Sequence, residues 1–397
     1  MMHQPLLSRR SALLGLSGAV VLGRASLAVA AAPIDRRFAV IILRGAMDGL
    51  SAVVPYGDPD LATWRHELLP PGPGQQGGLL DLGGFYGLHP VLTGMHQLYQ
   101  DSELLAVHAV AGHYRSRSHF EAQDYLESGA DRRMDSGWLN RALTLVAGSS
   151  LPSAEPAVSI SVTVPLLLRG PVGVATWAPP TFDPLDADLY HRIVALNQAD
   201  PVTGPALMDA MRQRGFSDQV LASGEPPRDR DAFAALCTAA AELMRVPDGP
   251  RVAALELEGW DTHTSQPSRL AAALTELDAG LVAFKAGLGD AWARTVVLVV
   301  TEFGRTVRAD GTLGTDHGTG TVAFIVGGAV AGGRVRANWP GLAQHNLFED
   351  RDLQPTADLR EVGKGLLAAH LGLTPAALLE VFPGSEHVAA MGQLLRN

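Results

Sequence analysis

The sequence predicts an α/β fold in which helices flank a mostly parallel central sheet. Short apolar runs rich in β-branched residues recur along the chain, as in buried parallel strands, and each run stops abruptly at glycine and polar residues. A second observation is the amphipathic pattern of Pro267–Leu288, whose leucines share one helix face. This helix separates the runs at Arg251–Glu258 and Thr295–Val300, so it fits the crossover that joins two parallel strands.

The first 30 residues resemble a twin-arginine signal peptide. Ser8–Leu13 contains the two arginines, and Ala28–Ala30 supplies the small residues of a cleavage site. The apolar run Leu13–Leu22 is too short to remain as a membrane-spanning helix. We therefore expect export of the folded protein by the twin-arginine machinery, a periplasmic or secreted location, and no stable membrane span.

Residues 31–397 are expected to form a single domain with insertions, because the candidate metal ligands are spread along the chain and must converge. The insertions are a loop rich in glycine and proline at about 65–80 and a mostly helical segment at about 180–245. Removal of the signal peptide takes away three arginines and no acid, so the formal net charge changes from −10 to −13. Such an acidic chain is not expected to bind nucleic acid.

Polar residues able to bind a metal lie where the predicted strands end, or just before the apolar run Thr321–Val326. They are Asp48, Asp261, His263, Glu302, Asp316 and His317. In open α/β sheets the loops at the carboxyl ends of the strands line the ligand crevice, so these side chains are expected to meet there. Carboxylate and imidazole donors suit hard or borderline divalent ions, and the single Cys237 excludes a zinc site made of several thiolates.

Each candidate ligand also has a purely structural interpretation. Asp48 and Asp316 are each able to bond the amides of their own glycine-rich turns. Glu302 is able to form an ion pair with Arg305 or Arg44, and Asp261 to cap the turn that follows it.

Ser118 precedes a helical stretch at Phe120–Glu127, which follows a predicted strand at Leu104–Val110. Together with Glu121 it fits a capping box, in which the serine hydroxyl binds a free backbone N–H at the helix start. Such a position favours anions and activates a hydroxyl nucleophile where a metal lowers its pKa. Both interpretations, nucleophile and helix cap, stay open. The neighbouring basic residues Arg115, Arg117 and His119 would suit an anionic substrate; the alternative is that they pair with Asp124 or Glu127.

Taken in order, these segments resemble the DUF1501 family of twin-arginine-exported bacterial proteins, which is distantly similar to the alkaline phosphatase and sulfatase superfamily. The matching stretches are the leader and Leu43–Ser51, Gly87–Pro90, His113–Phe120, Gly259–His263, Thr301–Arg305 and Thr315–Gly318. The resemblance implies an alkaline-phosphatase-like three-layer sandwich with a mostly parallel central sheet.

The resemblance also implies two metal sites with a nucleophile between them. The ligands would be Asp48 and Glu302 for one metal, and Asp261, His263 and His317 for the other. Ser118 would be the nucleophile. In the mechanism that we expect for such an enzyme, Arg117 or Arg305 would hold the anion. Two departures from the superfamily pattern are Phe303, where a histidine often follows the acid, and the short spacing from Asp261 to His263.

The function that these features predict is an exported metal-dependent hydrolase of phosphate or sulfate esters. Its cofactor would be a divalent ion, namely zinc, manganese or calcium, and its substrate an anionic ester, either a small molecule or a polymer. The alternative is a periplasmic binding or assembly protein that keeps the fold without catalysis. The two departures favour this alternative, because a fold does not imply a function.

Overall fold

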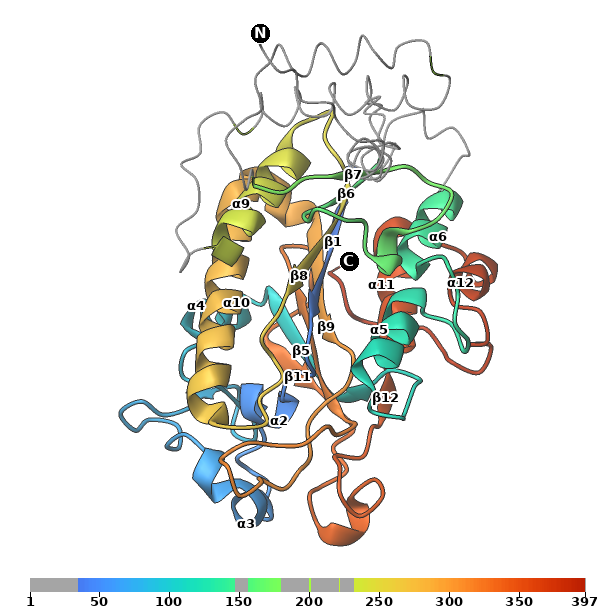
Figure 1. Cartoon of the computed structure of the whole chain (residues 1–397). Helices are drawn as coiled ribbons and strands as arrows, with labels where there is room; N and C mark the ends of the chain where they lie inside the picture. Colours follow the sequence, from blue (N-terminus) through green and yellow to red (C-terminus); the bar gives the residue numbers. More distant parts are fainter. Residues whose placement is uncertain (1–34, 147–155, 180–199, 201–220, 222–231, 397) are drawn as a thin grey trace, which may run out of the picture.

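The computed structural model describes residues 35–146, 156–179, 200, 221 and 232–396 (Figure 1). The predicted signal peptide lies outside these residues, and so does most of the helical segment expected at about 180–245. From that segment, α9 (Ala232–Arg245) is described and is helical. No described helix is both long enough and apolar enough to cross a membrane.

The centre of the described chain is a nine-stranded sheet with the order β11-β5-β10-β9-β1-β8-β6-β7, in which β12 also pairs with β5. Its strands are β1 (Arg37–Leu43), β5 (Leu104–Ala111), β6 (Ala157–Ser159), β7 (Val174–Thr176), β8 (Val252–Leu257), β9 (Thr295–Thr301), β10 (Thr321–Val326), β11 (Arg334–Arg336) and β12 (Ala357–Asp358). All neighbours are parallel except β10, which is antiparallel to both β5 and β9. The predicted α/β class with a mostly parallel sheet is confirmed.

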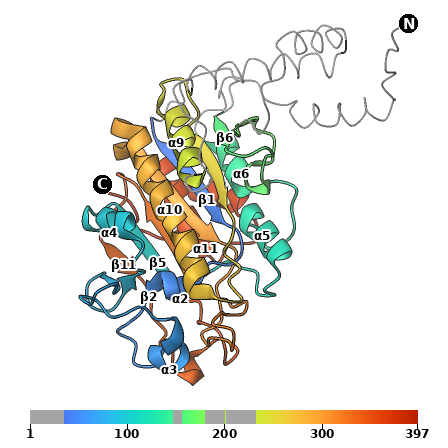
Figure 2. The same cartoon turned by 60° about the vertical axis from the view of Figure 1, so that its left-hand side comes forward.

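Helices cover both faces of the sheet and give three layers (Figures 1 and 2). One face carries α4 (Thr93–Gln100), α9 and α10 (Gln266–Leu288), and the other carries α5 (His119–Ser128), α6 (Trp138–Leu145), α11 (Leu359–Leu371) and α12 (Pro375–Val381). Alternate residues of β1 enter the two cores: Ala39 and Ile41 pack on the α10 side, and Phe38 and Val40 on the α11 side. Burial on both faces explains why the strand is apolar throughout.

A small second sheet and several short helices lie beside the main sheet. The sheet has the order β2-β4-β3, with β2 (Val53–Val54), β4 (Gly87–Leu88) and β3 (Leu80–Asp81), and the helices are α2 (Gly49–Ala52), α3 (Leu61–Arg65) and the 3-10 turns His66–Leu68, Leu166–Leu168, Gly289–Arg294 and Gln344–Asn346. The loop expected at about 65–80 therefore begins later, after Leu68, and ends where Leu80 starts β3.

The strand register brings the polar segments to one edge of the sheet. Leu43, the last residue of β1, pairs with Leu257 of β8 and with Thr301 of β9, so three parallel strands end at the same level. Because β10 is antiparallel, its first residue, Thr321, pairs with Val110 near the end of β5. The loops after four strands and the loop before a fifth consequently meet at this edge.

Candidate metal centre

Three imidazoles and one carboxylate converge at this edge of the sheet. The Nε2 atom of His317 lies 2.9 Å from Nε2 of His263 and 3.0 Å from Nε2 of His119. The Oδ1 atom of Asp261 lies 3.0 Å from Nε2 of His263, 3.3 Å from Nε2 of His317 and 3.5 Å from Nε2 of His119. His119 begins α5, Asp261 and His263 follow β8, and His317 precedes β10. We call these four residues the His–Asp cluster.

Glycines allow the loops that carry the cluster to approach one another. Gly45 has a φ of +118°, and a Cβ atom there would lie 2.7 Å from the backbone nitrogen of Asp261. A Cβ atom on Gly318 would lie 2.2 Å from the carbonyl carbon of Arg305, which forms an antiparallel bridge with His317. A side chain at either glycine would therefore push a ligand-bearing loop away from its neighbour.

The hydrogen bonds of His119 and His317 decide which ring nitrogens carry protons. Nδ1 of His119 lies 2.8 Å from Oε1 of Glu302, and Nδ1 of His317 lies 3.0 Å from the backbone oxygen of Arg117. Both oxygens only accept, so each Nδ1 donates, and Nε2 of each neutral ring presents a lone pair. Two lone pairs facing each other repel unless a cation lies between them.

The pKa shifts fit the same arrangement. Burial alone would raise the pKa of Glu302, but hydrogen bonds led by that from His119 outweigh it and lower the pKa, so this carboxylate is ionised at neutral pH. The hydrogen bond to Glu302 raises the pKa of His119, whereas burial and then the charge of His119 lower the pKa of His317. A proton on Nε2 of His119, or a metal ion in its place, removes the repulsion. Metal-binding histidines commonly donate their other N–H to a carboxylate or a carbonyl in this way.

The His–Asp cluster is open to solvent. The side chain of His119 is 22% exposed, that of His317 28%, that of His263 40% and that of Asp261 46%. Three imidazoles and a carboxylate are ligands that zinc accepts, and the exposure leaves room for water or a substrate next to a bound ion. The residues present therefore fit a divalent metal. Three of them, His119, Asp261 and His317, have ligand atoms that all lie within 4.8 Å of one another.

The family model described as "Protein of unknown function (DUF1501)" matches residues 110–382. The chain belongs to the DUF1501 family. The matched region contains the entire His–Asp cluster. No curated protein matches the sequence significantly.

Solved structures resemble this DUF1501 protein only remotely. Ps i-CgsB in complex with k-i-k-neocarrahexaose has 8% identity and a TM-score of 0.39, covering 85% of this chain and 72% of that one. The phosphonate monoester hydrolase of Agrobacterium radiobacter has 10% identity and a TM-score of 0.38, covering 86% and 74%. A protein in the alkaline phosphatase superfamily from Vibrio parahaemolyticus has 12% identity and a TM-score of 0.34, covering 81% and 71%. Likenesses this remote say nothing about the chemistry of the site.

The DUF1501 structure brings together three of the six predicted ligands, and beside them lies His119, which the sequence analysis did not name as a ligand. Asp261, His263 and His317 belong to the cluster, as expected from the resemblance. His119 was expected only to add positive charge, yet its Nε2 faces His317. One signal did point to it: His119 follows a strand end through a short loop, as the predicted ligands do.

Asp48 has a different environment from the one predicted. Its buried carboxylate pairs with Nη1 of Arg65 at 2.6 Å and accepts hydrogen bonds from Oγ of Ser51 at 2.8 Å, from Nε2 of Gln266 at 2.5 Å and from the amide of Leu50 at 3.2 Å. Three of these donors contact Oδ2 and one contacts Oδ1, and Arg65 supplies the positive charge that a metal ion would otherwise provide. Asp48 and Glu302 were expected to share one metal. Instead they have separate partners: Asp48 pairs with Arg65, and Glu302 accepts a hydrogen bond from His119.

Glu302 and Asp316 lie next to the cluster rather than within it. Glu302 is buried behind His119, where it also accepts from the amide of Gly45 at 2.9 Å. Asp316 is exposed, and its Oδ1 lies 3.5 Å from Nδ1 of His263. Both acids therefore contact histidines of the cluster on the side away from Nε2.

The two arginines expected to hold an anion are bound to the protein itself. Arg305 is 1% exposed and donates to the backbone oxygens of Gly45, Ala46, Trp260 and Thr315 and to Oδ1 of Asp261. Arg117 donates through Nε to Asp352 at 2.8 Å and through Nη2 to Glu349 at 2.5 Å. Their guanidinium groups connect loops, which is a different role from the predicted contact with substrate.

Ser118 is the N-cap residue of α5 by position, but its side chain makes no capping hydrogen bond. Glu121 instead accepts a hydrogen bond from the hydroxyl of Tyr114. The predicted capping box is therefore wrong. Ser118 is half-buried and directly precedes His119, so its hydroxyl is not committed to the helix end.

Proposed function

We propose that this DUF1501 protein binds one divalent metal ion through the His–Asp cluster and uses it to hydrolyse phosphate or sulfate esters. The observation that carries the proposal is that Nε2 of His317 faces Nε2 of both His119 and His263, while Nδ1 of His119 and of His317 is occupied by oxygen acceptors. A set of three nitrogens and one oxygen favours zinc, with manganese next, over calcium, which takes six to eight oxygen ligands.

The protein's own residues would divide the work. A bound divalent ion supplies charge that polarises the ester and lowers the pKa of a nearby hydroxyl or water. Glu302 would keep His119 oriented, and Arg305 would keep Asp261 at the cluster. Ser118, whose hydroxyl makes no capping bond, would be the nucleophile or would orient an attacking water.

Metal content is the first test. We expect the protein purified without chelator to hold close to one equivalent of zinc or manganese by elemental analysis. His119→Ala and His317→Ala should lose it, whereas His387→Ala, which changes an exposed histidine outside the cluster, should keep it. Free metal at 100 times its Kd should stabilise the wild type by about 2.7 kcal/mol and leave the two cluster variants unchanged. A wild-type protein that holds no metal and gains no stability from it contradicts the proposal.

Catalysis is a separate test. The metal-loaded protein should hydrolyse an aryl phosphate or an aryl sulfate, and removal of the metal should abolish turnover. Ser118→Ala should keep the metal and lose turnover if the serine is the nucleophile, and should retain part of it if water attacks.

One observation favours a second candidate function, a metal-containing binding or assembly protein without catalysis. Arg117 and Arg305, the cations expected to hold the anion of the substrate, donate to acceptors of the protein itself. Metal at full occupancy with no turnover of either ester would support this alternative.

Export to the periplasm or beyond is also proposed, on the basis of the leader at residues 1–30. Replacement of Arg9 and Arg10 by lysine in a fusion of the leader to a folded reporter should block its export through the twin-arginine machinery. Unchanged export of the double variant would contradict this route.

A further inference from the structure

Gln266 lies at the start of α10 and contacts both loops that carry cluster residues. It is 1% exposed, and its Oε1 accepts a hydrogen bond from Oγ1 of Thr262 at 2.9 Å and another from Oγ1 of Thr315 at 2.6 Å. Thr262 stands between Asp261 and His263, and Thr315 lies two residues before His317. Both threonines are fully buried. One amide oxygen thus joins the loop after β8 to the loop before β10.

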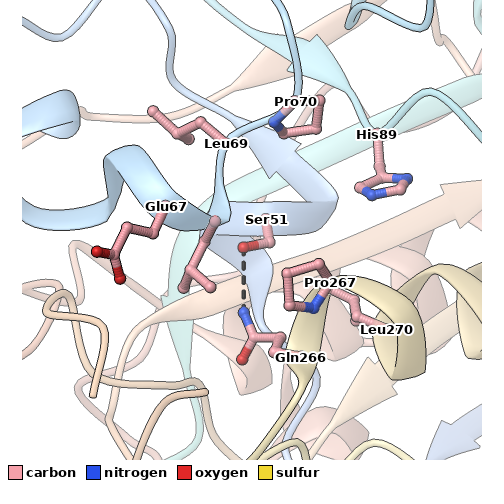
Figure 3. Close-up of a pocket in the computed structure, with 9 residues that line it drawn as sticks. Ser51, Glu67, Leu69, Pro70, His89, Gln266, Pro267 and Leu270 are labelled. Atoms are coloured by element: carbon pink, nitrogen blue, oxygen red, sulfur yellow. Dashed lines mark hydrogen bonds between the residues drawn. The ribbon is translucent and has the colours of Figure 1, made fainter. Parts of the chain in front are cut away.

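The other end of the Gln266 amide is anchored in a buried ion pair. Its Nε2 donates to Oδ2 of Asp48 at 2.5 Å. It also donates to Oγ of Ser51 at 3.3 Å, as Figure 3 shows. Asp48 pairs with Arg65, which in turn donates to the backbone oxygens of Thr306 at 2.6 Å and Val307 at 2.8 Å. The network therefore continues to the segment that follows Glu302 and Arg305.

We propose that Gln266 is a positioning residue that sets the separation of the two loops that hold Asp261, His263 and His317. This inference rests on the metal binding proposed above. A glutamine amide has a fixed polarity, with its oxygen toward the two hydroxyl donors and its nitrogen toward the carboxylate of Asp48. No smaller side chain spans these partners. Metal–ligand distances tolerate changes of only about 0.2 Å, so small movements of the loops weaken the site.

A cavity affects how the inference is tested. A cavity of about 160 Å³ is lined by Ser51, His89 and Gln266, among others, and Figure 3 shows Gln266 and Ser51 beside it. Water is able to enter from this cavity and bond the groups that a shortened side chain leaves unpaired. Stability alone would then change little, so the affinity for metal and the mobility of the loops are the informative measurements.

The first experiment compares zinc affinity, measured by competition with a chelator, in the full protein. Gln266→Ala should raise the Kd by about 10- to 100-fold, the effect typical of losing a supporting hydrogen bond of a metal site. Gln97→Ala, which changes an exposed glutamine of α4, is the matched control and should leave the Kd unchanged. Hydrogen exchange of residues 259–266 and 312–318 should be faster in Gln266→Ala than in the wild type, with or without zinc.

A charge swap separates positioning from general packing. Gln266→Glu keeps the size and the acceptor for both threonines but sets a second carboxylate against Asp48, so its Kd should also rise. Adding Asp48→Asn removes the second carboxylate while its amide oxygen still faces Arg65 and Ser51, so the Kd should fall below that of Gln266→Glu.

The outcomes distinguish the two proposals. An unchanged Kd and unchanged exchange in folded Gln266→Ala overturn the positioning role while the metal site stands. A Kd in the double variant that is no lower than in Gln266→Glu also counts against it. If the wild type itself binds no metal, the proposed function fails, and the exchange rates of the two loops alone decide whether Gln266 holds them.

Discussion

Nδ1 of His119 donates to Oε1 of Glu302 at 2.8 Å, which links the first residue of α5 to the residue that follows β9. The same carboxylate oxygen accepts from the amide of Gly45 at 2.9 Å and from Nε2 of Gln123 at 3.1 Å. Two further donors hold this oxygen in place, and the oxygen in turn orients the imidazole. The direction of Nε2 of His119 is thus set by Glu302 after β9, which Gly45 and Gln123 of α5 hold in position.

Glu302→Gln should weaken zinc binding by about 10- to 100-fold without unfolding the protein. The neutral amide supports the ring less strongly, and it is able to turn its NH₂ group toward Nδ1, which would favour the wrong tautomer. Competition with a chelator measures the Kd, and circular dichroism checks the fold. Glu258→Gln, at an exposed acid one residue past β8, is the control. Equal affinities for wild type and Glu302→Gln would show that His119 needs no carboxylate behind it.

The fold class and the convergence of three of the six predicted ligands could be predicted from the sequence, because both follow from strand ends. An apolar run such as Thr295–Val300 predicts a buried strand. When such strands are parallel, the acids and histidines that follow them lie at the same edge of the sheet. The loop before β10 joined them because β10 is antiparallel, an orientation that the apolar pattern of Thr321–Val326 does not reveal. The grouping of Asp261, His263 and His317 could therefore be predicted without knowledge of the strand order.

The remaining part of the site depends on pairings between distant residues, which no local pattern encodes. Asp48 follows a strand end as the ligands do, but its partner Arg65 comes from α3, a five-residue helix that the sequence analysis placed partly in a loop. The segment around His119 was interpreted as a capping box at Ser118, so His119 was not considered as a metal ligand. The small sheet β2-β4-β3 has two-residue strands, too short to show any periodicity.

Acid should destabilise the protein through its buried neutral histidines. Burial lowers the pKa of His370 and of His108 from 6.5 to about 4, while each ring keeps a hydrogen bond to a backbone oxygen. Between these two pKa values the unfolded chain binds more protons than the folded one, so stability falls as pH decreases from about 6.5 to about 4. Each histidine contributes a slope of at most about 1.4 kcal/mol per pH unit.

The variant His370→Gln isolates one of these contributions, because glutamine keeps a donor for the backbone oxygen of Arg37. Urea unfolding at pH 7 and at pH 5 should show a smaller loss of stability in the variant than in the wild type. The difference between the two losses should be about 1–2 kcal/mol. Carboxylates that also titrate in this range contribute equally to both proteins, so their contribution cancels. The same pH dependence in both proteins would mean that His370 is protonated in the folded state.

Gly45→Ala should damage the metal centre and the fold together. The φ of +118° strains an alanine, and its Cβ atom would lie 2.7 Å from the nitrogen of Asp261. The strained backbone alone costs about 1–3 kcal/mol, and relief of the clash would move Asp261 away from the histidines. Gly311→Ala, where a Cβ atom meets nothing within 4 Å, is the control. Urea unfolding and zinc titration should both distinguish the two variants, and full zinc affinity in Gly45→Ala would show that the loop adapts.

Arg65→Met should be the most destabilising of these substitutions. Arg65 and Asp48 are both completely buried, so loss of the guanidinium leaves a carboxylate without its countercharge, at a cost of about 3–5 kcal/mol. Adding Asp48→Asn removes the unpaired charge and should recover a large part of that loss. Arg132→Met breaks the exposed pair with Asp131 and should change the free energy of unfolding by less than about 0.5 kcal/mol. Urea unfolding measures all four proteins. Two results would contradict this account: a cost below about 1 kcal/mol for Arg65→Met, or no recovery in the double variant. Either would mean that Arg65 does not hold Asp48 as an ionised group, and a cation would then be able to compete for this carboxylate.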